Sequence, residues 1–271
     1  MKTIKQILII ALVLMLGAQI GTAIYLGASD RDDRPTITCP QGVFEISAKD
    51  DESVLMTGVA ATDNQDGDLT DRVIIASVSK LISKDTAKVT YLVFDSDDNM
   101  ASLVRYIRYT DYQKPQFKVK VPLVYSDTGE VELMSRLGAI DVLDGDISDR
   151  VRVSTLVATD DSRIYDITIQ VTNSMGDTAW LVLPVVRQSS ESLRPVVTLK
   201  ETLVYVDKGG SFDAKQYLSS VSLAQGIADL ANVKIEGTVD TNKADTYRVI
   251  YTYTDNSSNE VGMAILTVVV Q

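Results

Sequence analysis

Carboxylates gathered in two loops are the residues of this chain whose types and spacing could do chemistry. The first loop reads Asp-Asn-Gln-Asp-Gly-Asp and supplies Asp63, Asp66 and Asp68. The second loop comes 78 residues later, reads Asp-Val-Leu-Asp-Gly-Asp and supplies Asp141, Asp144 and Asp146. Calcium takes about six to eight oxygen ligands in proteins. Each loop therefore predicts part of a calcium site, which backbone carbonyls, water or a neighbouring turn would complete.

A structural interpretation of the same loops competes with calcium binding. Aspartate side chains accept hydrogen bonds from backbone amides in consecutive turns, and a loop glycine can take a positive φ. Gly67 and Gly145 lie at the same place in the two loops, and Asp71 with Arg72 can form a surface ion pair. On this interpretation the carboxylates shape the turns and bind no ligand.

Paired carboxylates also suggest a third interpretation, a glycan-active enzyme. Such enzymes need one carboxyl group whose pKa is raised by burial, whereas these aspartates are expected in polar turns, where they stay ionised. The chain has no histidine and one cysteine, Cys39, which excludes Ser-His-Asp and Cys-His catalysis and histidine-ligated zinc. The sequence therefore predicts no enzyme, and calcium is the one cofactor that it leaves open.

Alternating apolar and polar residues predict the strands that hold these loops. Val, Ile and Tyr alternate with other residues at 89–93, 167–171 and 249–253, and each run precedes a turn rich in Asp, Asn and Ser. Strands are also expected directly after the loop positions, at 73–75 and 233–235. Many short strands with turns at close intervals predict an all-β fold built from two-sheet antiparallel sandwiches.

Three copies of one module account for the chain beyond its N-terminal segment. Pro35, Pro115 and Pro195 stand 80 residues apart, and each opens an alternating run. A period this long predicts domains with separate cores. The expected ranges are 1–28 for the N-terminal segment and 33–111, 112–191 and 192–271 for the modules. Short linkers without long Gly/Ser runs favour a semi-rigid rod.

The third copy departs from the other two at the loop. It reads Gly-Ile-Ala-Asp-Leu at 226–230, so the carboxylate cluster is lost although the following strand persists. Residues 213–231 carry a weak helical period, which predicts a short helix or turn. Because the third copy has a different surface, it is the first module to test for partner binding.

The N-terminal segment predicts export. Residues 7–28 contain no charge and follow Lys2 and Lys5. About 20 apolar residues match the thickness of a bilayer, and lysines before the span keep the N-terminus in the cytoplasm. We therefore expect one transmembrane helix, with a C-terminal ectodomain outside the cell membrane. The alternative is a signal peptide cleaved near 21–23, which would secrete the protein.

The net charge of the chain limits the classes of partner that we expect it to bind. Thirty-seven acidic and 26 basic side chains give a net charge of -11. Such a surface repels nucleic acid, which is therefore not expected as a partner. The expected partners are the membrane, through the N-terminal helix, and an unidentified envelope or surface protein or glycan.

The two recurring motifs together resemble a known bacterial module. Asp-x-x-Asp-Gly-Asp-Leu-Thr at 63–70, followed by Tyr-x-Val-x-Asp-x-x-x-Asn at 91–99, is similar to the bacterial immunoglobulin-like repeat named after an insecticidal crystal protein. The first two copies carry both motifs and the third carries only the second. The resemblance implies immunoglobulin-like sandwiches on the surface of a Gram-positive bacterium, where such repeats act as spacers and adhesion modules. We therefore expect a non-catalytic, membrane-anchored rod of three modules.

Overall fold

The computed structural model describes residues 34–126, 132–188 and 194–271. The expected membrane segment lies outside these ranges. Within them, every helix is too short or too polar to cross a bilayer. The chain divides into two compact units, of which the first extends to Arg108 and the second comprises Tyr109–Gln271 together with Ser47–Lys49.

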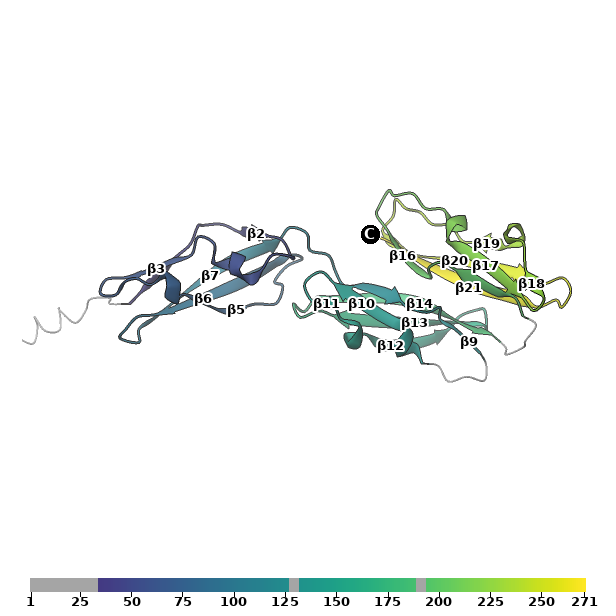
Figure 1. Ribbon diagram of the computed structural model, residues 1–271, viewed down its shortest axis with the longest axis horizontal. Coiled ribbons are helices and arrows are strands. Elements are labelled where there is room, and N and C mark those ends of the chain that lie inside the picture. The colour runs from purple at the N-terminus through teal and green to yellow at the C-terminus, as the bar shows by residue number, and fades with distance from the viewer. Residues whose placement is uncertain (1–33, 127–131, 189–193) are drawn as a thin grey trace, which may run out of the picture. The chain divides into compact units, whose positions relative to one another are not determined.

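The first sandwich, residues 34–109, has seven strands (Figure 1). They are β1 (Thr36–Thr38), β2 (Phe44–Ile46), β3 (Ala60–Asp63), β4 (Gly67–Asp68), β5 (Ile74–Val78), β6 (Thr86–Phe94) and β7 (Met100–Tyr109). The strand order is β1-β3-β4 in one sheet and β2-β7-β6-β5 in the other. The fold is therefore the expected pair of sheets.

The second sandwich repeats this order. Its strands are β8 (Gln116–Val119), β9 (Val124–Ser126), β10 (Leu137–Asp141), β11 (Gly145–Asp146), β12 (Arg152–Ala158), β13 (Ile164–Thr172) and β14 (Thr178–Gln188). They form the sheets β11-β10-β8 and β12-β13-β14-β9. A four-residue helix, α2 (Leu133–Arg136), precedes β10.

The third sandwich has the same topology. Its strands are β15 (Val196–Leu199), β16 (Leu203–Val206), β17 (Leu218–Leu223), β18 (Gly226–Ile227), β19 (Lys234–Glu236), β20 (Asp245–Thr254) and β21 (Val261–Val270). They form the sheets β15-β17-β18 and β16-β21-β20-β19. The three-module boundaries themselves stay a prediction.

Short 3-10 turns connect the strands of every sandwich. They are η1 (Glu52–Met56), η2 (Thr70–Arg72), η3 (Ser148–Arg150), η4 (Ala214–Tyr217) and η5 (Leu230–Asn232). The sheets are mainly antiparallel, as expected, but β9 pairs with β14 and β16 pairs with β21 in parallel. The reason is that the chain passes from the first sheet to the second after β8 and after β15, and pairs there with the last strand.

The core of each sandwich follows the predicted alternation. Val89, Tyr91 and Val93 of β6 are fully buried, as are Ile167, Ile169 and Val171 of β13. In β20 the equivalent Val249 and Tyr251 are buried and Tyr253 is partly buried. Tyr91 donates a hydrogen bond of 2.6 Å to the carbonyl oxygen of Leu55, which lies in η1. A buried tyrosine needs such a partner for its hydroxyl. The inward positions of the alternating strands are therefore what the sequence specifies best.

The short helix or turn predicted for 213–231 is confirmed only at the ends of this range, where η4 and η5 lie, and strands replace it in between. After the short turn η4 this segment forms β17 and β18. The helix-like spacing of its apolar residues arises because β17 contains an irregularity. Thr198 faces Ser220 but Leu199 faces Leu218, so one residue of β17 is unpaired. A bulge of this kind places Leu218 and Val221, three residues apart, on the same side. The spacing of three that imitates a helix is thus a bulged strand.

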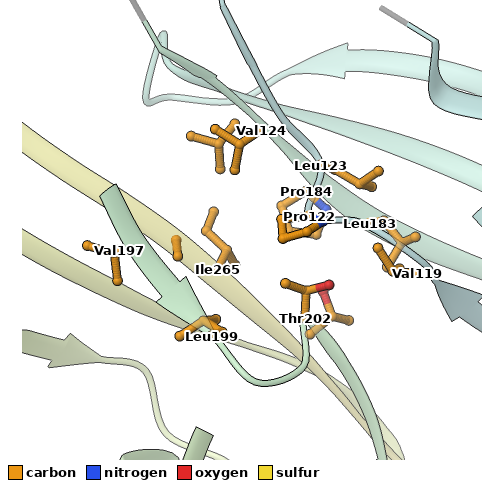
Figure 2. Close-up of a pocket in the computed structure, with 13 residues that line it drawn as sticks. Val119, Pro122, Leu123, Val124, Leu183, Pro184, Val197, Leu199, Thr202 and Ile265 are labelled. Atoms are coloured by element: carbon orange, nitrogen blue, oxygen red, sulfur yellow. The ribbon is translucent and has the colours of Figure 1, made fainter. Parts of the chain in front are cut away.

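The second and third sandwiches pack against each other within the second unit. Ile164 and Val186 of the second sandwich form one buried cluster with Met263 and Ile265 of the third. Figure 2 shows the neighbouring contact, where side chains such as Val124 lie opposite Ile265 across a cavity of about 30 Å³. The facing side chains are mainly apolar, so the contact buries hydrophobic surface.

Polar contacts fix the same interface. Arg248 of β20 donates a hydrogen bond of 2.5 Å to Asp166 of β13. The Gln188 side-chain amide donates to the carbonyl oxygen of Met263 at 2.9 Å. The two sandwiches are therefore joined by sheet faces as well as by the linker.

Candidate functional site

The first aspartate loop is a hydrogen-bonded turn. The Asp63 Oδ1 atom accepts bonds from the backbone amides of Gln65 at 2.7 Å and Asp66 at 2.9 Å. The Asp68 Oδ1 atom accepts a bond from the Thr70 amide at 2.9 Å, where η2 begins. Two of the three aspartates therefore satisfy amides that the turn would otherwise leave without partners.

Asp66 connects this loop to the turn between β6 and β7. Its Oδ2 accepts from the Ser96 amide at 2.6 Å and its Oδ1 accepts from the Ser96 hydroxyl at 2.7 Å. The Arg72 guanidinium lies 3.5 Å from Oδ2. The carboxylate is thus fully engaged in joining two loops that are 30 residues apart.

The second loop repeats the local bonds. Asp141 Oδ1 accepts from the amides of Leu143 at 2.9 Å and Asp144 at 3.0 Å. Asp146 Oδ1 accepts from the Ser148 amide at 2.9 Å. The same geometry at equivalent residues confirms that the motif builds one kind of turn twice.

Asp144 repeats the connection that Asp66 makes. Its carboxylate accepts from the Ser174 amide at 2.7 Å and from the Ser174 hydroxyl at 2.5 Å, and it pairs with Arg150. Burial alone would raise the pKa of Asp144, but the bonds from Ser174 and Arg150 outweigh it and lower the pKa. This carboxyl group therefore stays ionised at neutral pH.

The remaining shifted carboxyl groups of the loops move in the same direction. Hydrogen bonds from Thr70 lower the pKa of Asp68, and hydrogen bonds from Ser148 lower the pKa of Asp146. A general acid at neutral pH requires a raised pKa. These groups are therefore suited to accepting hydrogen bonds and not to donating a proton.

One difference separates the two loops. The second oxygen of Asp141, Oδ2, accepts from the side-chain amide of Asn173 at 3.1 Å. In the first loop Asp63 Oδ2 is buried and has no hydrogen-bond partner, and Asp95 stands in the sequence where the second copy has Asn173. A carboxylate has no amide hydrogen to donate, so the first loop leaves one buried oxygen unsatisfied.

The third copy closes its turn without the carboxylates. Leu223 pairs with Gly226 across the turn, just as Asp63 pairs with Gly67. The glycine has a positive φ in all three copies, with values of 78° at Gly67, 72° at Gly145 and 124° at Gly226. Glycine adopts this conformation at little cost. The expected positive φ at the two loop glycines is confirmed, and the glycine is the feature that all three turns keep.

The six aspartates do not gather into one recognisable metal centre. Within the described part of the chain, no group of three or more Asp, Glu, Cys or His side chains is placed to hold a metal ion. Calcium binding by Asp63, Asp66 and Asp68, or by their equivalents in the second loop, stays a prediction.

Sequence reasoning missed the interface between the second and third sandwiches. Its signal is β21, where Met263 and Ile265 on one face are buried as well as Leu266 and Val268 on the other. Nearly continuous apolar sequence in a strand indicates that both faces are covered. The sequence offered this signal, although it does not say which surface provides the cover.

Comparison with known proteins gives one family match. Residues 198–270 match the family described as "Bacterial surface protein, Ig-like domain". An uncharacterised 81.3 kDa protein of Acholeplasma phage L2 is 26% identical over 144 residues, which are 51% of this chain and 19% of the phage protein. The chain therefore spans about a fifth of this relative.

Solved structures that align with this chain include two multidomain proteins. The M60 catalytic domain with two CBM51 domains of Clostridium perfringens ZmpB aligns with 88% of this chain and 31% of its own, at 13% identity and a TM-score of 0.25. Drosophila N-cadherin EC1-4 aligns with 89% of this chain and 76% of its own, at 13% identity and a TM-score of 0.21. The family match is the informative result, and it identifies the third sandwich as similar to an immunoglobulin-like domain of bacterial surface proteins.

Proposed function

We propose that this chain is a non-catalytic protein of the bacterial cell surface, whose immunoglobulin-like modules serve as spacers, adhesion modules or protein-interaction modules. The observation that carries the proposal is the match of residues 198–270 to a domain of bacterial surface proteins. The finer assignment, to the repeat named after an insecticidal crystal protein, is supported by the Asp-Gly-Asp motifs of the first two copies.

The geometry of the aspartate loops supports a role without catalysis. Asp66 and Asp144 each hold a neighbouring turn through both carboxylate oxygens. Side chains fully occupied in shaping loops are unsuited to act as catalysts for a glycan substrate. The glycan-active enzyme is therefore the weakest of the three interpretations, and we propose that the modules bind a surface protein or glycan without converting it.

The packed pair of sandwiches supports a function in presentation. The apolar cluster around Val186 and Ile265, together with the Asp166–Arg248 pair, resists rotation of one sandwich against the other. A rigid pair holds its surface in one orientation, which lowers the entropic cost of binding a partner. We infer that the second and third sandwiches act together as one presenting body.

The proposed location can be tested in cells. We propose that residues 7–28 anchor the protein in the cell membrane and that the modules lie outside, with secretion after cleavage as the alternative. A C-terminal epitope tag should be removed by protease added to intact cells. Sequencing of the mature N-terminus separates the two forms, because an anchored chain keeps residues 1–28. A tag protected in intact cells and digested only after lysis would contradict the proposal.

Calcium binding at the first loop is a second candidate function. The observation that favours it is the buried Asp63 Oδ2, which lacks a hydrogen-bond partner, whereas the corresponding oxygen of Asp141 is bonded to Asn173. An additional cation could satisfy the first oxygen but would have to displace an amide from the second. We therefore propose that any calcium site lies in the first loop.

A pair of matched variants tests the calcium proposal. Millimolar calcium should raise the melting temperature of the purified protein, and Asp63→Asn should abolish the rise. The equivalent change in the second loop, Asp141→Asn, should leave the calcium effect intact. Equal loss in both variants would contradict a site confined to the first loop, retention in both would place the effect elsewhere, and the absence of any shift in the unsubstituted protein would end the proposal.

A further inference from the structure

A cleft in the second unit lies beside the edge strand β8. Its volume is about 480 Å³, within the range of about 300–1,000 Å³ that is usual for ligand clefts. One wall is formed by residues 116–120, which include β8, and the other by residues 200–205, which lead into β16. Since β8 is the last strand of the sheet β11-β10-β8, the cleft borders a strand edge.

The backbone groups of β8 that point away from β10 belong to Phe117 and Val119. Phe117 lies opposite Ala139, whose amide and carbonyl oxygen are bonded to residues that follow β11. Phe117 and Ala139 therefore exchange no backbone hydrogen bonds. Because bonded and non-bonded pairs alternate along antiparallel strands, Val119 exchanges none with Leu137 either. The amides and carbonyls of Phe117 and Val119 thus point out of the sheet edge.

One of these four groups already binds an oxygen from the third sandwich. The Phe117 amide donates a hydrogen bond of 2.8 Å to the hydroxyl of Tyr205 in β16. Among the described residues, no group bonds to the Val119 amide or to the carbonyl oxygens of Phe117 and Val119. An open edge of this kind is a template for another strand. A strand in the cleft supplies backbone partners to all four groups, with one of its carbonyls in the place of the Tyr205 hydroxyl.

Lysines surround this edge. Lys118 and Lys120 lie on the same face of β8 and its extension, Lys200 lies in the opposite wall, and all three are exposed. None of them forms an ion pair within residues 34–126, 132–188 and 194–271. The walls contribute one carboxylate, Glu201. Asp146 lies nearby, and its hydrogen bonds, followed by the charges of the lysines, lower its pKa. Cationic groups therefore outnumber anionic ones, which favours an acidic partner.

We propose that this cleft binds an extended acidic segment of another protein, which adds to the β8 edge as an antiparallel strand. The residues opposite Lys118 and Lys120 carry the carboxylates, because opposite charges stabilise cross-strand pairs. The residues between them lie opposite Phe117 and Val119 and pair with their backbone groups. In strand addition the main-chain bonds give affinity and the side chains give specificity.

The site deepens the proposed interaction function and rests on it for its biological setting. The two proposals can nevertheless fail separately, because peptide binding is measured on purified protein and surface exposure is measured on intact cells.

Titration of the purified full-length protein with a capped octapeptide of alternating Glu and Val tests the site. The carboxylates of this peptide share one face when it is extended. Calorimetry should show saturable binding that weakens with added salt. The double variant Lys118→Gln/Lys120→Gln should lower the affinity by roughly tenfold. Lys80→Gln/Lys84→Gln removes the same charge from the loop between β5 and β6 and should bind as the unsubstituted protein does.

A second arm tests whether the backbone edge is used. N-methylation of the four valines keeps every carboxylate but removes the N–H groups that pair with Phe117 and Val119, and should weaken binding by roughly tenfold or more. Saturation with the unmethylated peptide should slow hydrogen exchange at the Val119 amide. An octapeptide of alternating Lys and Val is the control for charge and should not bind.

Three results would overturn the proposal. The first is that the Glu-Val peptide does not bind, and the second is that it binds equally to the two double variants or no better than its methylated form. The third is a dimer in sedimentation whose Val119 amide is protected before peptide is added, which would assign the edge to a second copy of this chain. Melting temperatures should be alike for all variants, because the substituted lysines are exposed.

Discussion

The first and third sandwiches use the same sheet position in opposite ways. Val104 of β7 faces Thr90 and Ile265 of β21 faces Ile250, so the two side chains occupy equivalent places on the outer face of a four-stranded sheet. Val104 is 49% exposed and Ile265 is 6% exposed, because the second sandwich covers the latter. Equivalent positions of one fold can therefore belong to a surface in one copy and to an interface in another.

The aspartate loops show a finer version of the same contrast. Asp63 and Asp141 make the same bonds through Oδ1, yet only Asp141 has a partner for Oδ2. What the copies share is the set of positions that build sheets and turns. What they do not share is the environment of the remaining atoms, and that environment decides the cost of a substitution.

The largest expected effect is at the outer-face sheet position that Val104 and Ile265 share. Ile265→Asp places a charge in the apolar interface between two sandwiches and should lower the free energy of unfolding of the second unit by roughly 3 kcal/mol or more. Val104→Asp, the matched change on the first sandwich, should cost about 1 kcal/mol or less because the side chain stays in water. Chemical denaturation of both variants measures the difference. Equal losses would show that Ile265 is not covered in solution.

The next largest effect separates the two loops. Asp141→Ala removes three hydrogen bonds from a buried carboxylate and should cost about 2 kcal/mol. Asp63→Ala removes two bonds and also an unsatisfied buried oxygen, so its cost should be about 1 kcal/mol. Thermal unfolding of the two variants under identical conditions tests this order. A greater loss for Asp63→Ala would mean that Asp63 Oδ2 has a partner in solution.

A smaller effect measures the ion pair across the interface. Asp166 and Arg248 are about one third exposed or less, and solvent screening limits such a pair to about 1 kcal/mol of coupling. The measurement is a double-mutant cycle with Asp166→Asn and Arg248→Gln. The exposed pair Lys234–Glu236 is the control and should show almost no coupling. Coupling of equal size in both cycles would contradict the assigned interface.

The sequence predicts the fold of this protein better than it predicts the contacts between residues that are distant in the chain. Alternation identified Val89, Tyr91 and Val93 as inward residues, because a strand places every second side chain on one face. It could not identify Ser96 as the partner of Asp66, because a single hydroxyl 30 residues away has no periodic signal. Short-range patterns specify which atoms are inside, whereas partners distant in sequence depend on how the loops meet.

The same reasoning explains why β17 was not predicted within residues 213–231 and why the interface was missed. Leu218 and Val221 imitate a helix because a bulge moves both to one side, and a bulge leaves no distinct mark in a short run of residues. Met263 and Ile265 indicate a second covered face, but any apolar surface would satisfy them.

The smallest expected effect concerns equivalent positions at which the two loops make the same hydrogen bonds. Asp68 and Asp146 each accept bonds that lower the pKa of the carboxyl group in the folded protein, from Thr70 and Ser148 respectively. A lowered folded pKa stabilises the protein above the unfolded pKa of about 4, and this stabilisation is lost as the pH falls through the folded value. Asp68→Asn and Asp146→Asn should therefore each melt slightly below the unsubstituted protein at pH 7, and the difference should begin to shrink near pH 4 and disappear once the pH is below the folded pKa.

Melting curves between pH 2 and pH 7 check whether these two variants behave alike. Both side chains are exposed, so added salt should weaken both effects to a similar extent. Because the two turns bond these carboxylates in the same way, matching pH profiles would show that the shared turn and not the surrounding surface determines the ionisation. A profile that changes in one variant only would mean that the copies differ even where their hydrogen bonds agree, and the comparison between equivalent positions would then fail at its simplest case.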